Sequence, residues 1–345
     1  MKKILLLLIS IIFLTACSNN NINDITKNFS DDVNNADSYE LVGKMSIVGD
    51  EEEFNYSINV KYLKDNNYKV ELLNVDNNHK QIILKNEEGV YVITPELNRS
   101  YKFESSWPNN SSQSYILGSL LKDINNDAKN TLKQKNNEYI ITTSVNYPNN
   151  EELVKENIYF DSKMKLKKVI VFDSSNKERI ITEFSKYDLN ANINKDEFKL
   201  DNYIKEINDE LKNTKSECKE GNCSKTTSNI LDDIIYPLYL PGNTFLTSSE
   251  SIGSEDNKRV ILTFKGDKDF TIIEEVASIP NEFEINPVYG DPVLLNDTLG
   301  VMQDNSVRWT RGNVSYYLTS NTLSSSEMSS IASSMNQTKS VAGSK

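Results

Sequence analysis

Apolar and polar side chains alternate along much of the first two hundred residues, and the clearest run is residues 54–62. There, every second side chain is large and apolar and each one between is polar. This period of two is typical of a β-strand with one buried face. The alternation recurs between residues 39 and 103 and again between 138 and 187, with turn residues between the segments. The pattern predicts a sheet of about ten strands, mainly antiparallel, with one solvent-exposed face.

The apolar face of the predicted sheet is the candidate ligand-binding surface. An apolar row of this kind packs either under a helix or against a bound hydrophobic ligand, and alternation alone does not distinguish the two. The candidate residues are Phe54, Tyr56, Ile58, Val60, Tyr62, Tyr91 and Ile93.

Two helical segments interrupt the alternation. Apolar residues from Ile22 to Val33 recur at spacings of three and four, which predicts an amphipathic helix over residues 22–36. Residues 115–124 are strongly apolar on one side and predict a second helix that covers or plugs the sheet. Residues 22–200 therefore predict an antiparallel sheet curled around inserted helices, in a mainly β (α+β) chain.

The pattern changes after residue 200. Residues 201–229 predict a short helix from Asp201 to Leu211, followed by a polar, lysine-rich linker. Residues 230–337 predict a small α/β C-terminal domain that contains a hairpin around Gly312, with Trp309 and Tyr316 packed in its core. A helix opened by the capping box Ser324 to Glu327 follows, and residues 338–345 form a tail.

The first seventeen residues contain an export signal. Two lysines, an apolar run and the small pair Thr15-Ala16 ahead of Cys17 resemble the signal peptide and lipobox of bacterial lipoproteins. The resemblance implies removal of residues 1–16, attachment of acyl chains such as palmitate to Cys17, and a lipidated tether over residues 17–21. Two acyl chains hold a protein on a membrane. The chain is thus expected on the extracytoplasmic face of the cell membrane; the alternative is a plain cleaved signal with an incidental thiol.

Cys218 and Cys223 are the other two cysteines of the chain. In an exported protein they either form a local disulfide in the linker or remain two free thiols, and the sequence leaves both open. The net charge of −12 argues against a nucleic-acid partner.

The sequence gives little support for an enzyme. His79 is the one histidine, so neither a histidine-based catalytic triad with a spare ligand nor a histidine-rich metal site can be assembled. Phosphate-binding glycine loops and the G-x-S-x-G elbow do not occur. The acidic run over residues 50–53 lacks the pattern of a calcium loop and predicts a solvated hairpin tip. We therefore expect no catalytic residue, metal or cofactor.

Residues 85–99 contain a glycine hairpin, an aromatic strand and a proline-led turn, and together with residues 157–161, 172–178 and 193–198 they resemble the LolA-like lipoprotein carriers. The resemblance covers roughly residues 20–200. It implies an incomplete barrel whose apolar concavity holds acyl chains. A lipobox beside a LolA-like domain is nearer to the sporulation and germination lipoproteins of spore-forming bacteria, such as GerS, which binds a cortex amidase.

Two functions follow from the residues and the resemblance. The first is a non-enzymatic, membrane-anchored lipoprotein that binds an acyl chain or other hydrophobic ligand and acts in the spore or cell envelope. The alternative is a tethered scaffold or activator that binds a cell-wall (cortex) amidase during sporulation or germination. An open concavity would favour the first function, and one plugged by residues 115–124 would favour the second.

Overall fold

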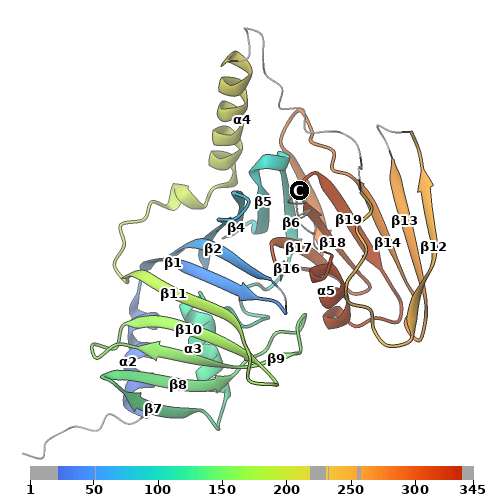
Figure 1. Cartoon of the computed structure of the whole chain (residues 1–345). Helices are drawn as coiled ribbons and strands as arrows, with labels where there is room; N and C mark the ends of the chain where they lie inside the picture. Colours follow the sequence, from blue (N-terminus) through green and yellow to red (C-terminus); the bar gives the residue numbers. More distant parts are fainter. Residues whose placement is uncertain (1–21, 51, 218–230, 232, 255–257, 336–345) are drawn as a thin grey trace, which may run out of the picture.

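The computed structural model describes residues 22–50, 52–217, 231, 233–254 and 258–335 (Figure 1). In this part of the chain nineteen strands form two sheets and the helices are few. The fold is mainly β, as predicted.

The larger sheet has twelve strands and is open, with β15 and β7 as its two edges. Its strands in spatial order are β15 (Glu284–Tyr289), β6 (Arg99–Glu104), β5 (Gly89–Thr94), β4 (His79–Asn86), β3 (Asn67–Asn74), β2 (Glu53–Leu63), β1 (Ser38–Val48), β11 (Glu178–Asp188), β10 (Leu166–Asp173), β9 (Leu153–Phe160), β8 (Glu138–Ser144) and β7 (Thr131–Lys135). Eleven of them precede residue 200, against about ten predicted. The sequence pattern does not reveal β7, because this edge strand is mostly exposed.

The smaller sheet has seven antiparallel strands and one helix beside it, where the sequence predicted a small α/β domain. Its strands in spatial order are β12 (Thr244–Ile252), β13 (Arg259–Gly266), β14 (Phe270–Val276), β19 (Val314–Thr319), β18 (Ser306–Arg311), β17 (Thr298–Gln303) and β16 (Asp291–Leu295). The predicted hairpin is confirmed in β18 and β19, where the rings of Trp309 and Tyr316 stack at 5.0 Å in the core.

Six helical segments accompany the sheets within the described residues. They are α2 (Ile22–Asn35), η2 (Pro95–Leu97), α3 (Leu117–Asn126), η3 (Lys195–Phe198), α4 (Leu200–Glu217) and α5 (Ser325–Ser333). The predicted capping box at the start of α5 is present, with the Glu327 amide donating to Ser324 Oγ at 3.1 Å.

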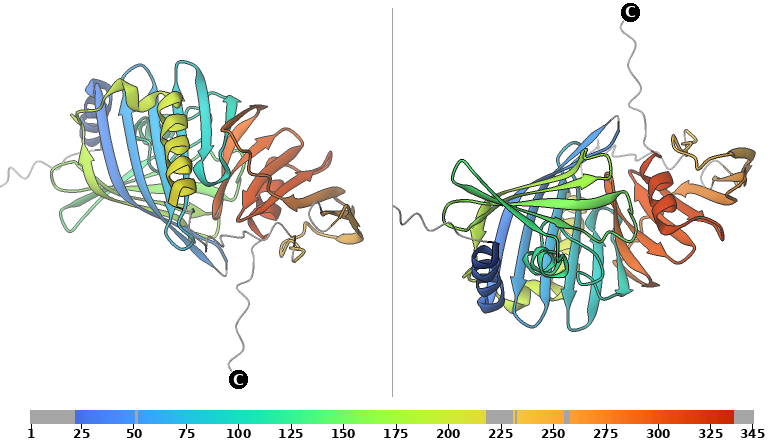
Figure 2. Two further views of the ribbon diagram at one scale, coloured as in Figure 1. Left: turned by 90° about the horizontal axis from the view of Figure 1, so that it is seen from above. Right: turned by 90° about the horizontal axis from the view of Figure 1, so that it is seen from below.

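The concave side of the larger sheet is filled by helices. Figure 2 shows α2 and α3 on the same side of the curled sheet. The apolar stripe of α3 is buried, including Leu120 and Ile124, and Phe29 of α2 meets Phe160 of β9 edge to face at 5.1 Å. Residues 115–124 therefore plug the concavity, which is one of the two arrangements that the sequence left open.

The convex side carries α4. Phe198, Leu200, Tyr203 and Ile207 pack on the outward side chains of β4 and β5. The helix runs to Glu217, six residues past the predicted end at residue 211, because lysine and glutamate in that stretch are good helix formers even without an apolar stripe.

A close approach of two strands explains one glycine in the larger sheet. The pairing of β1 with β11 shifts by one residue between Val42 and Gly43. A Cβ atom at Gly43 would lie 2.2 Å from the carbonyl oxygen of Glu183. Because only glycine avoids this clash, it permits the bulge.

The two sheets are joined by strands of the C-terminal half. After β14 the chain crosses to the larger sheet, where β15 pairs in parallel with β6. Leu299 and Val301 of β17 belong to the apolar core beneath the larger sheet, while Met302 belongs to that of the smaller one. The predicted domains over residues 22–200 and 230–337 thus share buried surface and a strand.

Candidate ligand cavity between the two sheets

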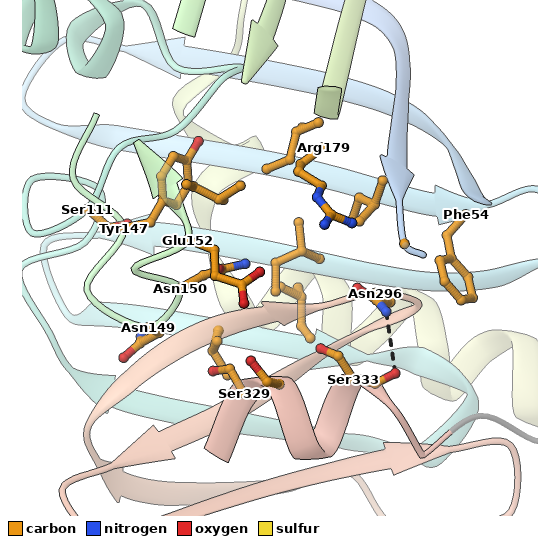
Figure 3. A pocket seen from close by; sticks show the side chains of 18 of the residues that line it. Phe54, Ser111, Tyr147, Asn149, Asn150, Glu152, Arg179, Asn296, Ser329 and Ser333 are labelled. Carbon is orange, nitrogen blue, oxygen red and sulfur yellow. Dashed lines mark hydrogen bonds between the residues drawn. The ribbon is translucent and has the colours of Figure 1, made fainter. Parts of the chain in front are cut away.

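A cavity of about 720 Å³ lies where one end of the larger sheet meets the C-terminal half (Figure 3). One wall is made by the ends of β1, β2 and β11 and the turn between β1 and β2. The loops at residues 107–115 and 147–153 make the second wall, and β16 and α5 make the third.

The floor of the cavity is apolar. Met45 and Ile47 reach it because alternate residues of β1 point to the concave side, and Trp107 closes it below with only 2 % of its surface exposed. The other apolar lining residues include Phe54, Ile83, Ile180, Leu294 and Leu299.

The polar lining comes from separate parts of the chain. Helix α5 lines the cavity with Ser329, Ser330, Ser333 and, just beyond its end, Ser334. Side-chain amides come from three further segments: Asn110 and Gln113, then Asn149 and Asn150, and Asn296 between β16 and β17.

An ion-pair network closes the end of the cavity next to the β1–β2 turn. Arg179 donates from Nη1 to Asp50 Oδ1 at 2.8 Å and from Nε to Asp173 Oδ2 at 2.7 Å, and Lys177 Nζ lies 3.0 Å from Asp50. Hydrogen bonds from Arg179 and Lys177 hold the pKa of Asp50 below its ordinary value. Gly49, Asp50 and Glu52 lie in the predicted hairpin tip, where the Gly49 amide donates to the Glu52 carbonyl at 2.8 Å.

Hydrogen bonds across the cavity fix its walls relative to one another. The Tyr56 hydroxyl donates to the Asn296 carbonyl at 2.9 Å, and Asn296 Nδ2 donates to the Ser333 carbonyl at 3.3 Å. A side-chain bond also joins Ser105 to Asp291. The cavity wall is therefore continuous from β2 through the β16–β17 turn to α5.

Gln81 makes the most buried polar contact between the sheets. Its Oε1 accepts from the Leu299 amide at 2.6 Å and from Thr298 Oγ1 at 3.3 Å, and all three residues are buried. Because a buried amide without a partner is costly, this contact ties β4 to β17.

The structure divides the candidate row of β2 between cavity and core. Phe54 lines the cavity. Tyr56 is buried with its hydroxyl on Asn296, Ile58 and Val60 lie in the filled core, and the half-buried Tyr62 stacks on Tyr39 at 4.8 Å.

Tyr91 and Ile93 were assigned to the wrong face. They point to the convex side and pack with α4, while Val90 and Val92 face the concave core. Strand β5 is buried on both sides, so its apolar run has no period of two to reveal its register.

The remaining predicted sites lie outside the described residues. This holds for Cys17, the predicted lipidation site, and for the possible disulfide partners Cys218 and Cys223. Within the described residues, no three His, Cys, Asp or Glu side chains are grouped to hold a metal ion. The same residues contain no helix with the length and apolarity needed to cross a membrane.

Sequence reasoning missed the polar half of the cavity. The capping box predicted the helix α5 but not that its serines line a cavity, and Arg179 and Glu152 were not among the candidate site residues. Asn296, which bonds to β2 and to α5, had no signal at all, because its partners are 37 residues away in α5 and 240 residues away in β2.

A carboxylic acid outside the cavity is buried in the core of the larger sheet. Glu156 of β9 is fully buried and neither of its carboxylate oxygens has a hydrogen-bond partner. Burial, with a smaller contribution from the nearby Asp123 of α3, raises the pKa of Glu156 well above its ordinary value. Burial likewise raises the pKa of Asp123 to about 6. Burial therefore disfavours the charged form of both acids.

Comparisons with known proteins give the following relatives. A family model described as "Sporulation protein YdcC-like" matches residues 1–198. The chain is 35% identical over 330 residues to sporulation protein YdcC of Bacillus subtilis, which covers 95% of this chain and 94% of the relative.

Similar solved structures are more distant. The Pseudomonas aeruginosa MucA/MucB complex matches with a TM-score of 0.32 and 13% identity over 90% of this chain and 97% of the other. A LolA superfamily protein from Nitrosomonas europaea gives 0.32 and 12% over 53% and 99% of the two chains. The CwlD amidase in complex with the GerS lipoprotein, from Clostridioides difficile, gives 0.30 and 16% over 49% and 95%.

Proposed function

Because this chain belongs to the YdcC-like family of sporulation proteins, we propose that it is a membrane-anchored, non-enzymatic binding protein of the spore or cell envelope. The observation that supports a binding role is the cavity of about 720 Å³ between the two sheets. Small-ligand sites commonly have volumes of about 300–1,000 Å³, mostly apolar walls and a few fixed polar groups. This cavity has such a volume and an apolar floor, and its polar lining is more extensive than is usual.

The ligand is expected to be hydrophobic over part of its surface. An acyl chain cannot occupy the part of the concave face that α2 and α3 fill. The floor around Met45, Ile47 and Phe54 remains as an apolar surface within an open space. The proposed ligand site is therefore the cavity, and of the seven predicted candidate residues on the strands only Phe54 lines it.

The membrane anchor is proposed from the lipobox at Cys17. Four residues separate Cys17 from Ile22, where α2 begins, and a fully extended chain spans about 3.5 Å per residue. The first turn of α2 would therefore lie within roughly 20 Å of the membrane surface. Replacing Cys17 by Ala should leave the protein exported but unlabelled by radioactive fatty acid, whereas Cys218→Ala should remain labelled. Labelled Cys17→Ala protein would refute the anchor.

The ligand role is tested by filling the cavity. Mass spectrometry should detect a small molecule or peptide co-purifying with residues 20–345, and Ser333→Trp should abolish its retention because the new ring occupies the space beside Asn296. Ser251→Trp is the control, because Ser251 is exposed on β12 and does not line the cavity. Equal retention by both variants, or no bound molecule in the unaltered protein, would contradict the proposal.

Exposed apolar side chains favour the scaffold as a second candidate. Along the edge strand β12, Phe245, Leu246 and Ile252 are 65%, 40% and 53% exposed. A cell-wall amidase could dock on this surface. Mixing the purified chain with a cortex amidase should then give co-elution in size-exclusion chromatography that Phe245→Glu removes. Val75→Glu is the control, since Val75 is 55% exposed at the β3–β4 turn of the other sheet. Separate elution of unaltered chain and amidase would remove this candidate.

A further inference from the structure

The charges that line the cavity are unbalanced. Among the described lining residues, four carry carboxylates and one carries a cation. The carboxylates belong to Asp50, Glu52, Glu152 and Asp291, and the cation to Arg179.

Arg179 is not available to a ligand. Its Nε bonds to Asp173 at 2.7 Å and its Nη1 to Asp50 at 2.8 Å, so two carboxylates already neutralise its charge. Its side chain is 20% exposed. The remaining lining carboxylates therefore set the sign of the electric field in the cavity.

Glu152 presents a carboxylate to the cavity. The residue is exposed, no cation pairs with it among the described residues, and Figure 3 shows its side chain directed into the space between the larger sheet and α5. On the opposite wall, Ser329 is 7% exposed and its hydroxyl has no hydrogen-bond partner. The open carboxylate indicates a ligand with a hydrogen-bond donor, and the unpaired hydroxyl on the facing wall can donate to the ligand or accept from it.

This field opposes an anionic ligand. A fatty-acid carboxylate or a phosphate headgroup would meet several carboxylates without an available cation, in a protein whose net charge is −12. Like charges brought together in a partly desolvated site cost several kcal/mol, and opposite charges attract there more strongly than in water. A cationic group is therefore the favoured polar part of the ligand.

The polar groups are also distributed in a way that suits a peptide. A single-headed lipid needs polar partners at one end of its site. Here amides and hydroxyls come from four separate segments, at residues 110–114, 149–150, 296 and 329–334. Repeated peptide groups with apolar side chains between them would meet both the polar lining and the apolar floor.

We propose that the cavity takes an extended peptide segment that carries lysine or arginine side chains next to apolar ones, with Glu152 as the main contact for the cation. This rests on the proposed function, namely that the cavity is a ligand site, and adds the chemical class of the ligand. Glu152 acts here as a binding and specificity residue.

The test compares two fluorescein-labelled peptides, LKVNLKVN and LEVNLEVN, by fluorescence anisotropy with the full chain in its Cys17→Ala form. The lysine peptide should bind at least tenfold more tightly, and its affinity should fall as salt is added. Glu152→Gln should weaken the lysine peptide about tenfold. Glu151→Gln removes the same charge from the neighbouring exposed residue, which does not line the cavity, and should change binding less than twofold.

Three outcomes would overturn the inference: equal or tighter binding of the glutamate peptide, equal effects of Glu151→Gln and Glu152→Gln, or no binding of either peptide at about 1 mM. A fluorescent fatty acid serves as the separate probe of the proposed function. If the peptide test fails but the fatty acid binds, and Ser333→Trp abolishes that binding, the cavity remains a ligand site and only the peptide assignment fails. If neither fatty acid nor peptide binds, both proposals fail.

Discussion

The two ends of β2 show the same alternation of side chains but have different surroundings. At one end Phe54 lines the cavity beside Asn296 and α5. Four residues further along, Ile58 is 1% exposed in a core filled by α3. The difference arises because α3 covers only part of the concave face. A period of two therefore reports which face is inward and not whether that face meets a helix or open space.

The largest expected effect is at the filled end of β2. Ile58→Ala should lower the free energy of unfolding by about 2–5 kcal/mol. The removed side chain leaves a cavity, and the tightly packed neighbours cannot move to fill it. Urea denaturation of the purified chain measures this loss. A loss below about 1 kcal/mol would mean that this end of the row is also open to solvent or ligand.

The next effect concerns the junction of the two sheets. Gln81→Met keeps the side-chain volume but leaves the buried Leu299 amide without its acceptor, which should cost about 1–3 kcal/mol. Gln134→Met on the exposed edge strand β7 is the control and should be nearly neutral. If the two variants were equally stable, the sheets would not depend on this contact.

The third effect is a rise in the free energy of unfolding when the buried acid Glu156 is replaced, and its size depends on pH. In the folded state the pKa of Glu156 is raised, so the folded protein holds a proton that the unfolded chain releases. The resulting stability is present below the unfolded pKa of Glu156 and is lost as the pH rises through its folded pKa. Asp123, whose pKa is about 6, and Glu274, where burial raises the pKa to about 7, act in the same direction.

Glu156→Gln should therefore raise the free energy of unfolding at pH 8 by roughly 1–3 kcal/mol, because the amide carries no charge to desolvate. The decline of stability between about pH 5 and 8 should become shallower but not vanish, since Asp123 and Glu274 remain. Glu138→Gln, on the exposed start of β8, should leave the curve unchanged. A stability that rises between about pH 5 and 8 in the unaltered protein would contradict the raised pKa values of these buried acids.

The smallest effect on stability is at the open end of β2. Phe54 is half-buried, so Phe54→Ala should cost about 1 kcal/mol or less in the free energy of unfolding, while lowering the affinity of the cavity for the lysine peptide several-fold. Denaturation and anisotropy on the same variant measure the two quantities. A loss as large as that of Ile58→Ala would show that both ends of β2 are core.

The sequence by itself determined the local elements. Strands with one wet face, such as β2, follow from alternating side chains, and α3 follows from its apolar stripe, because in each case the period of the pattern is the period of the element. The β18–β19 hairpin and the capping box of α5 depend on neighbouring residues and were predicted for the same reason.

The tertiary structure decided how these elements combine. The sequence did not reveal which side chains of β5 face the concave core, because burial on both sides of this strand removes the alternation. Strand β15, with Pro287 at its centre, pairs with β6 across more than 180 residues, and no local signal encodes that contact. The cavity likewise joins Glu152, Asn296 and Ser329 from loops and a helix far apart in the chain. Such a site is a property of packing, because each of its side chains is an ordinary polar residue until the fold places it opposite the others.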